Sequence, residues 1–117
     1  MIRVLVSGAD GRMGSETVKA VLADNELEFV GGTSLMNVGK DAGEVIGISS
    51  LGLPLYGSLN EALKMAKPDV VVDFTTPAAI YGNVKTCIEN GTNIVVGTTG
   101  LTAQQRNELD EAAKKAD

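Results

Sequence analysis

Three glycines between an apolar run and a helix-like segment constrain the fold of this 117-residue chain more than any other feature. Gly8, Gly11 and Gly14 form the pattern G-x-x-G-x-x-G directly after the apolar, β-branched residues 2–6. The first glycine permits a tight strand-to-helix turn, the second lets a ligand approach the backbone, and the third lets helix and strand pack closely. The amides that open such a helix attract an anion. We therefore predict a strand, a phosphate-binding turn and a helix, in that order.

The rest of the chain alternates between strand-like and helix-like segments. Apolar runs, three of them rich in β-branched residues, predict strands at residues 2–6, 27–33, 53–56, 70–74 and 93–96. Capping residues and apolar spacing predict helices at residues 12–23, 58–66, 77–91 and 102–117. Residues 34–52 have little periodicity and are expected to be a long irregular connection with room for one short helix at 41–46. Strands that alternate with helices imply parallel pairing through right-handed crossovers. We predict an α/β, doubly wound, Rossmann-like sheet of order 3-2-1-4-5, forming one dinucleotide-binding domain over residues 1–117.

Several residues fix the expected details of these elements. Met13, Thr17, Ala20 and Val21 stand at helical spacing. Pro54 lacks an amide donor, which suits an edge strand. Three helices have N-terminal signals: the capping pairs Ser58 with Glu61 and Thr102 with Gln105, and Thr76 before Pro77.

Composition excludes several classes of function. The net charge of -5 argues against a broad electrostatic grip on nucleic acid or on an anionic membrane. No apolar run approaches the ~20 residues that span a bilayer. We therefore expect a cytoplasmic protein without nucleic-acid or membrane partners, and no metal site. Cys87, the single cysteine, is expected to be a small core residue in a reducing compartment rather than a nucleophile.

The end of the second predicted strand bears on cofactor choice. An acid there usually accepts hydrogen bonds from the ribose of NAD, but this chain has Thr33 and Ser34. The Ser34 hydroxyl repels no 2′-phosphate and can donate to one, and Arg12 and Lys40 lie close enough in sequence to add positive charge. NADPH is therefore the predicted cofactor, with NADH possible. In the alternative interpretation, Ser34 caps the next turn and Arg12 is a solvated helix residue.

Two further loops follow strand ends, where doubly wound sheets bind ligands. The segment D-F-T-T-P at 73–77 follows the fourth strand, and G-T-T-G at 97–100 follows the fifth. Phe74 can pack against a nicotinamide ring, while the hydroxyls and amides of 97–99 can bind carboxamide or carboxylate oxygens. The alternative is structural, because Thr76 is a good N-cap and Gly100 a good turn residue.

Four motifs together carry a resemblance to a known family. V-S-G-A-D-G-R-M-G at 6–14, D-A-G-E at 41–44, D-F-T at 73–75 and G-T-T-G at 97–100 resemble the amino-terminal half of 4-hydroxy-tetrahydrodipicolinate reductase, an enzyme of lysine and diaminopimelate biosynthesis. The order and spacing of the motifs make the resemblance specific, and it covers essentially the whole chain. It implies hydride transfer from NADPH or NADH to a cyclic, unsaturated dicarboxylate.

The resemblance also implies roles for individual residues. The glycine turn would hold the pyrophosphate with six residues: Gly8, Ala9, Asp10, Gly11, Arg12 and Met13. Phe74 and Thr75 would lie beside the nicotinamide. Gly97, Thr98 and Thr99 would meet the nicotinamide and the substrate, with Thr99 contacting a substrate carboxylate.

One departure from the family concerns the catalytic acid. Family members continue into a carboxy-terminal domain that binds substrate, forms homo-oligomers and supplies a histidine-rich motif and a lysine. This chain contains no histidine. We therefore name no catalytic residue in it and expect this piece alone to be inactive.

Two other functions use the same glycine turn. A noncatalytic NAD(P)-sensing module would report cofactor occupancy to a partner. The first domain of another amino-acid-pathway dehydrogenase, such as aspartate or homoserine dehydrogenase, would share fold and cofactor, because the glycine turn does not choose a substrate. D-F-T and G-T-T-G favour the reductase over the sensing module, and G-R-M-G together with G-T-T-G favours it over another dehydrogenase.

Overall fold

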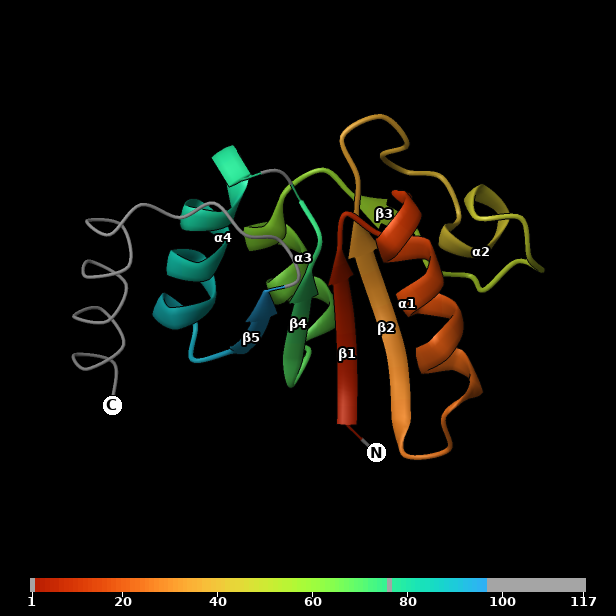
Figure 1. The fold of residues 1–117 in the computed structure, drawn as a ribbon, viewed down its shortest axis with the longest axis horizontal. Coiled ribbons are helices and arrows are strands. Elements are labelled where there is room, and N and C mark those ends of the chain that lie inside the picture. Colours follow the sequence, from red (N-terminus) through yellow and green to blue (C-terminus); the bar gives the residue numbers. More distant parts are fainter. Residues whose placement is uncertain (1, 76, 97–117) are drawn as a thin grey trace.

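The computed structural model describes residues 2–75 and 77–96. These residues form a five-stranded parallel sheet of order β3-β2-β1-β4-β5 (Figure 1). Its strands are β1 (Ile2–Ser7), β2 (Leu27–Thr33), β3 (Leu55–Tyr56), β4 (Val70–Asp73) and β5 (Asn93–Val96). The helices are α1 (Arg12–Ala23), α2 (Ala42–Val45), α3 (Leu59–Ala66) and α4 (Pro77–Glu89). The predicted doubly wound fold and its strand order are confirmed.

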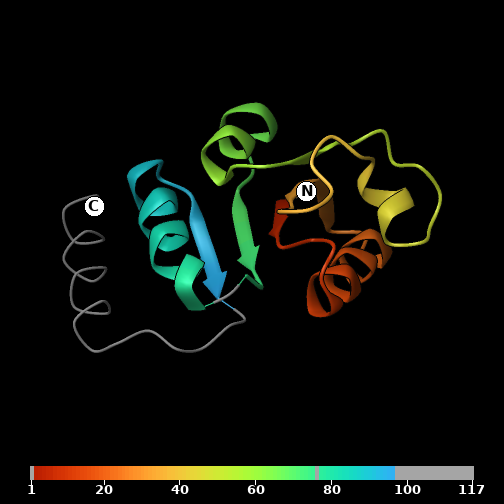
Figure 2. The same cartoon turned by 90° about the horizontal axis from the view of Figure 1, so that it is seen from above.

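Two hydrophobic clusters lie on opposite faces of the sheet. Side chains alternate along a strand, so Val4 and Val6 of β1 pack toward α1 while Leu5 packs toward α3. Figure 2 shows α1 and α3 on opposite sides of the sheet. The cluster on the α3 side consists of Leu5, Val30, Leu59, Ala62, Leu63, Ala66, Val71 and Cys87. This two-sided core fixes the strands whose carboxyl ends form the site.

The helix α1 has the predicted bounds but a different buried face. The sequence places four residues at helical spacing: Met13, Thr17, Ala20 and Val21. Of these only Val21 is buried, and Met13 is 60% exposed. The buried face instead consists of Gly14, Val18 and Val21. A Cβ on Gly14 would collide with the carbonyl oxygen of Gly8, so the closest approach of helix to strand falls at Gly14 and turns that face inward.

Two element ends differ from the prediction by two residues. The edge strand β3 begins at Leu55 rather than at residue 53, because Pro54 forms only an isolated antiparallel bridge with Asp41. The helix α4 ends at Glu89, and Gly91, with φ of 68°, turns the chain toward β5. The predicted cap at Thr76 and the predicted helix at 102–117 lie outside the described residues.

The helices α2 and α3 begin as predicted. Asp41 caps α2 by accepting a hydrogen bond from the Glu44 amide at 2.9 Å. Ser58 caps α3 by accepting from the Glu61 amide at 3.4 Å. These local contacts satisfy first-turn amides, and the Ser58–Glu61 contact is the one that the capping pattern predicts.

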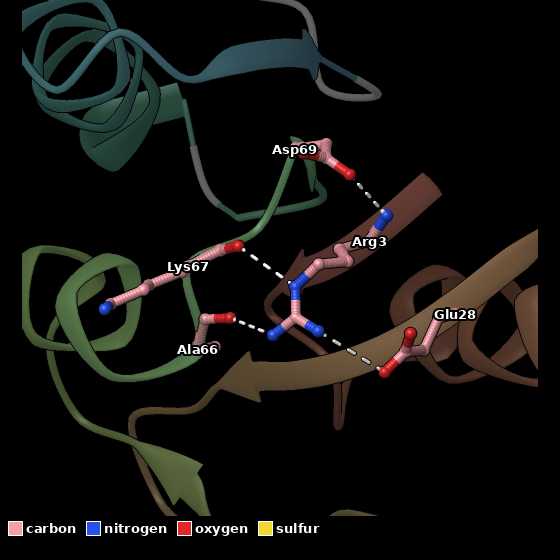
Figure 3. A network of polar contacts seen from close by, with 5 residues as sticks. All are labelled: Arg3, Glu28, Ala66, Lys67 and Asp69. Carbon is pink, nitrogen blue, oxygen red and sulfur yellow. Dashed lines mark hydrogen bonds and ion pairs between the residues drawn. The ribbon is translucent and has the colours of Figure 1, made fainter. Parts of the chain in front are cut away.

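At the amino ends of the strands, the Arg3 side chain binds carbonyl oxygens at the carboxyl end of α3 (Figure 3). Its Nη2 and Nε atoms donate to the carbonyl oxygens of Ala66 at 2.6 Å and Lys67 at 3.2 Å. Its backbone amide donates to Asp69 at 2.9 Å, and Nη1 lies 3.5 Å from a carboxylate oxygen of Glu28. The contacts satisfy carbonyls that a helix end leaves unpaired, so this network holds the fold at the end away from the site. Among the described residues, no helix is long and apolar enough to cross a bilayer.

Candidate cofactor site

A cavity of about 530 Å³ opens where the carboxyl ends of β1, β2 and β4 meet. Six of the predicted cofactor residues line it: Gly8, Asp10, Gly11, Ser34, Phe74 and Thr75. Ala9 is buried, while Arg12 and Met13 are exposed at the start of α1. The predicted contacts of Gly97, Thr98 and Thr99 lie outside the described residues. Residues far apart in sequence therefore converge on the edge of the sheet where doubly wound folds bind ligands.

Thr33 at the end of β2 holds the glycine turn in place. Its Oγ1 accepts a hydrogen bond from the Gly8 amide at 3.1 Å and lies 3.1 Å from the Ser7 hydroxyl. Its carbonyl oxygen accepts from the Ala9 amide at 3.0 Å. Gly8 has φ of 79°, a conformation that a side chain would strain, and an added Cβ would lie 3.3 Å from the Phe74 carbonyl oxygen. The amides of Gly8 and Ala9 are thus engaged inside the turn.

The first turn of α1 leaves its amides open. Gly11 is the N-cap and has no side chain to bond them, and the first helical hydrogen bond runs from the Ser15 amide to the Gly11 carbonyl oxygen at 2.8 Å. The amides of Arg12, Met13 and Gly14 therefore have no intrahelical acceptor. An added Cβ on Gly11 would have one contact within 4 Å, the Gly8 carbonyl oxygen at 3.5 Å. Open amides beside open space are the geometry of an anion site.

Ser34 and Asn37 both bind the carboxylate of Asp10. The Ser34 hydroxyl donates to Oδ2 of Asp10 at 2.7 Å, and Nδ2 of Asn37 donates to the same oxygen at 2.6 Å. The Ser34 oxygen also accepts from the amides of Met36 at 3.2 Å and Asn37 at 2.9 Å. These bonds match the alternative in which Ser34 caps a turn, and they direct its single proton to Asp10.

Asp10 is held in its charged form. Partial burial acts to raise its pKa, but the hydrogen bonds from Ser34, from Asn37 and from its own backbone amide outweigh burial and lower the pKa below its ordinary value. The carboxylate is therefore ionised at neutral pH, at the wall of the cavity nearest β2.

A buried carboxylate organises the other side of the cavity. Asp73 is fully buried, and its Oδ1 accepts from the Thr75 amide at 2.8 Å and the Thr75 hydroxyl at 2.6 Å. Its Oδ2 accepts from Nδ2 of Asn83 in α4 at 3.0 Å, and that nitrogen lies 3.1 Å from the Thr75 hydroxyl. The Phe74 amide donates to the Ser7 carbonyl oxygen at 3.0 Å. Phe74 and Thr75 are thus fixed between β1 and α4.

Cys87 lies in the core behind this network. It is fully buried, and burial together with the charge of Asp73 raises the pKa of its thiol to about 12. A thiol that resists ionisation is a poor nucleophile. The prediction that Cys87 is a core residue is confirmed.

The D-A-G-E motif shapes the long connection between β2 and β3. Besides the Glu44 amide, the Asp41 carboxylate accepts hydrogen bonds from the amides of Leu51, Gly52 and Leu53 at 2.8 to 3.2 Å. The Glu44 bond is the largest influence that lowers the pKa of Asp41 to about 2. Asp41 does not line the cavity, so this motif holds a loop rather than a ligand.

Sequence reasoning missed three residues of the site. It did not single out Asp73 and Asn83 as supports for Thr75, nor Asn37 as a support for Asp10. An aspartate two residues before a threonine at a strand end is a signal for a local side-chain turn, which could have identified Asp73. Asn83 and Asn37 have no such signal, because only the folded chain brings them to their partners.

Comparison with known proteins identifies the family. Residues 2–117 match the family model described as the amino-terminal region of dihydrodipicolinate reductase. The 4-hydroxy-tetrahydrodipicolinate reductase of Listeria monocytogenes is 48% identical over 113 residues, covering 97% of this chain and 43% of the relative. The Methanocaldococcus jannaschii reductase is 43% identical over 120 residues, covering 98% of this chain and 44% of the relative.

A solved structure agrees with these relatives. The dihydrodipicolinate reductase of Paenisporosarcina sp. TG-14, solved with dipicolinate bound, superimposes with a TM-score of 0.84 at 31% identity. The match covers 99% of this chain and 44% of that one. The chain thus spans less than half the length of these relatives, in the part that the family model assigns to the amino terminus. It belongs to the dihydrodipicolinate reductase family.

Proposed function

We propose that this chain is the cofactor-binding part of a 4-hydroxy-tetrahydrodipicolinate reductase, which transfers hydride from NAD(P)H to a cyclic, unsaturated dicarboxylate. The observation that carries the proposal is the uncapped first turn of α1, whose open amides lie beside the cavity at the carboxyl ends of β1, β2 and β4. The matched relatives bear the name of this reductase, which favours it over another amino-acid-pathway dehydrogenase. From the family resemblance we further propose that the protein acts in lysine and diaminopimelate biosynthesis, in the cytoplasm and as a homo-oligomer.

The glycine turn fits the pyrophosphate of a dinucleotide. The Gly11 N-cap leaves room for a phosphate, and the amides of Arg12 and Met13 are available to donate to it. Gly8 and Ala9 act through shape, because their own amides donate to Thr33. The helix dipole of α1 adds favourable potential at the same point.

The other side of the cavity fits the nicotinamide end of the cofactor, which supplies the hydride. Phe74 lines the cavity and offers an apolar surface to a planar ring. The network of Asp73 and Asn83 fixes Thr75 beside Phe74, so the ring would meet a rigid wall. We expect Gly97, Thr98 and Thr99 to complete this end, with Thr99 contacting a carboxylate of the substrate.

NADPH is the proposed preferred cofactor. Two features support this choice: β2 itself ends in Thr33 and Ser34 rather than in an acid, and Arg12 adds an exposed cation at the start of α1. The Ser34 hydroxyl does not support a preference for NADPH, because its proton is donated to Asp10. NADH remains a usable cofactor.

The proposal is tested by titrating the intact protein with NADPH and with NADH while following cofactor fluorescence. Gly11→Asp places a carboxylate where the pyrophosphate would lie, so we expect at least a hundredfold (~10²) loss of affinity for both cofactors. Gly82→Asp is the matched control, because an added Cβ at Gly82 meets nothing within 4 Å and Gly82 does not line the cavity.

Two results would overturn parts of this proposal. A folded wild-type protein that binds neither cofactor, or a Gly11→Asp variant that binds as wild type does, contradicts the dinucleotide site. Tighter binding of NADH than of NADPH contradicts only the NADPH preference. Circular dichroism of each variant shows whether a loss of binding reflects the site or the fold.

A further inference from the structure

An ionised carboxylate occupies the position over the end of β2, although β2 itself ends without an acid. In doubly wound folds, an acid at the end of the second strand binds the ribose of the adenosine half. Here Asp10, which comes from the glycine turn, lies against Ser34 and Asn37, directly after β2. The glycine turn, rather than β2, therefore supplies a carboxylate at the position where an acid would bind the ribose.

We propose that Asp10 is a specificity-determining residue that accepts a hydrogen bond from the adenosine ribose and disfavours a 2′-phosphate, which keeps NADH competent beside NADPH. The inference rests on the proposed function, because it assumes that a dinucleotide lies across the glycine turn. It goes beyond that function by assigning the choice between the two cofactors to one side chain.

The bonding of Asp10 leaves it able to accept a ligand hydroxyl. A carboxylate has about four acceptor positions. Ser34, Asn37 and the residue's own amide take three of them, and these donors hold the carboxylate in one orientation. A ribose hydroxyl can supply the remaining donor, whereas a phosphate oxygen cannot donate.

The surroundings do not cancel the charge of Asp10. In the part of the chain that the structure describes, the two ion pairs are Arg3 with Glu28 and Lys19 with Glu16, and neither includes Asp10. The single proton of Ser34 is directed at Asp10 and so cannot bind a phosphate. A 2′-phosphate at this position would meet a like charge across a half-buried cavity wall, where screening is weaker than in bulk water.

The test measures the dissociation constants of the intact protein for NADPH and for NADH in Asp10→Asn. This change removes the charge and keeps an acceptor for Ser34. We expect the ratio of the NADPH constant to the NADH constant to fall by about tenfold, mainly through tighter NADPH binding. Glu26→Gln is the matched control: it removes one exposed negative charge at the amino end of β2 and should leave the ratio unchanged.

A second pair of variants separates Asp10 from Ser34 and from misfolding. Asp10→Ser is another neutral replacement and should move the ratio in the same direction, so the test survives if Asp10→Asn does not fold. Ser34→Ala keeps the charge of Asp10 but removes one of the two side-chain donors that orient it, so the ratio should move in the same direction as in Asp10→Asn and by less. A ratio that stays at the wild-type value in both neutral variants overturns the inference, as does a Ser34→Ala variant that selectively loses NADPH. If the wild type binds neither cofactor, the proposed function fails instead.

Discussion

The two sides of the cavity are built from different materials. On the side of the glycine turn, backbone groups face the place of a phosphate: the Thr33 side chain ties down the turn from behind, and the first amides of α1 stay open. On the side of β4, a side-chain network forms the wall, with buried Asp73 bonded to Thr75 and Asn83. The comparison teaches that one side depends on the absence of side chains and the other on one particular side chain.

The largest expected effect tests the backbone side. Gly14→Ala places a Cβ against the Gly8 carbonyl oxygen, a backbone atom that cannot move without opening the glycine turn. We expect a loss of about 3 kcal/mol in the free energy of unfolding, together with loss of cofactor binding. Denaturant unfolding measures the first effect and cofactor fluorescence the second.

The matched control for this change is Gly82→Ala in α4. An added Cβ there meets nothing within 4 Å, so the substitution should stabilise the protein by about 0.5–1 kcal/mol through helix propensity. A Gly14→Ala variant as stable as wild type would mean that the turn tolerates a side chain. The contrast between the two walls would then be lost.

A smaller effect is expected on the side-chain wall. Asp73→Asn replaces a carboxylate that accepts three hydrogen bonds with a neutral amide, whose NH2 group would face either the Asn83 amide nitrogen or the two Thr75 donors. We expect a loss of about 2 kcal/mol in the free energy of unfolding and hydride transfer slowed by about tenfold. Binding of 5′-AMP, which lacks the nicotinamide half, should not change.

Two further measurements distinguish a positioning role for Asp73 from a purely structural one. Asn83→Ala removes one of the three bonds and should give a smaller loss in both quantities. The pKa of Cys87, read from thiolate absorbance, should fall in Asp73→Asn yet stay above its ordinary value, because burial is the larger cause of its elevation. If hydride transfer in Asp73→Asn keeps the wild-type rate, the network holds only the fold.

The same contrast explains what the sequence could predict. The bounds of β1, α1 and β2 follow from local signals, namely apolar runs, glycine spacing and stop residues, so the predicted bounds agree with the structure to within one residue. The predicted buried face of α1 is wrong, because that face depends on the contact between Gly14 and Gly8 in the folded chain. Ser34 and Asn37, the partners of Asp10, lie 24 and 27 residues further along the chain. Asn83, a partner of Asp73, lies 10 residues away. No local sequence pattern connects these residues. Local sequence therefore predicts the backbone of the glycine turn, whereas the side-chain networks can be identified only in the folded chain.

The smallest expected effect concerns Asp41, an acid that lies outside both walls of the cavity. Asp41 organises the loop after β2 much as Asp73 organises the turn after β4, yet it is only partly buried and does not line the cavity. Its pKa in the folded protein is about 2, below the value of about 3.9 for an unfolded chain. A lowered folded pKa means that its stabilising contribution is fully present above about pH 4 and is lost as pH falls through about 2.

Asp41→Asn should therefore be less stable than wild type at pH 7, and the difference should shrink as the pH falls from about 4 to about 2. Denaturant unfolding at a series of pH values measures this, with Glu26→Gln as the control for loss of one exposed charge. Cofactor affinity at pH 7 should match wild type, because the Asp41 bonds end on the loop amides of Leu51, Gly52 and Leu53. If Asp41→Asn instead weakened cofactor binding as strongly as Gly11→Asp does, the backbone geometry of the glycine turn would depend on a carboxylate outside the cavity. The two sides of the cavity would then differ only in how far their carboxylates lie from the ligand.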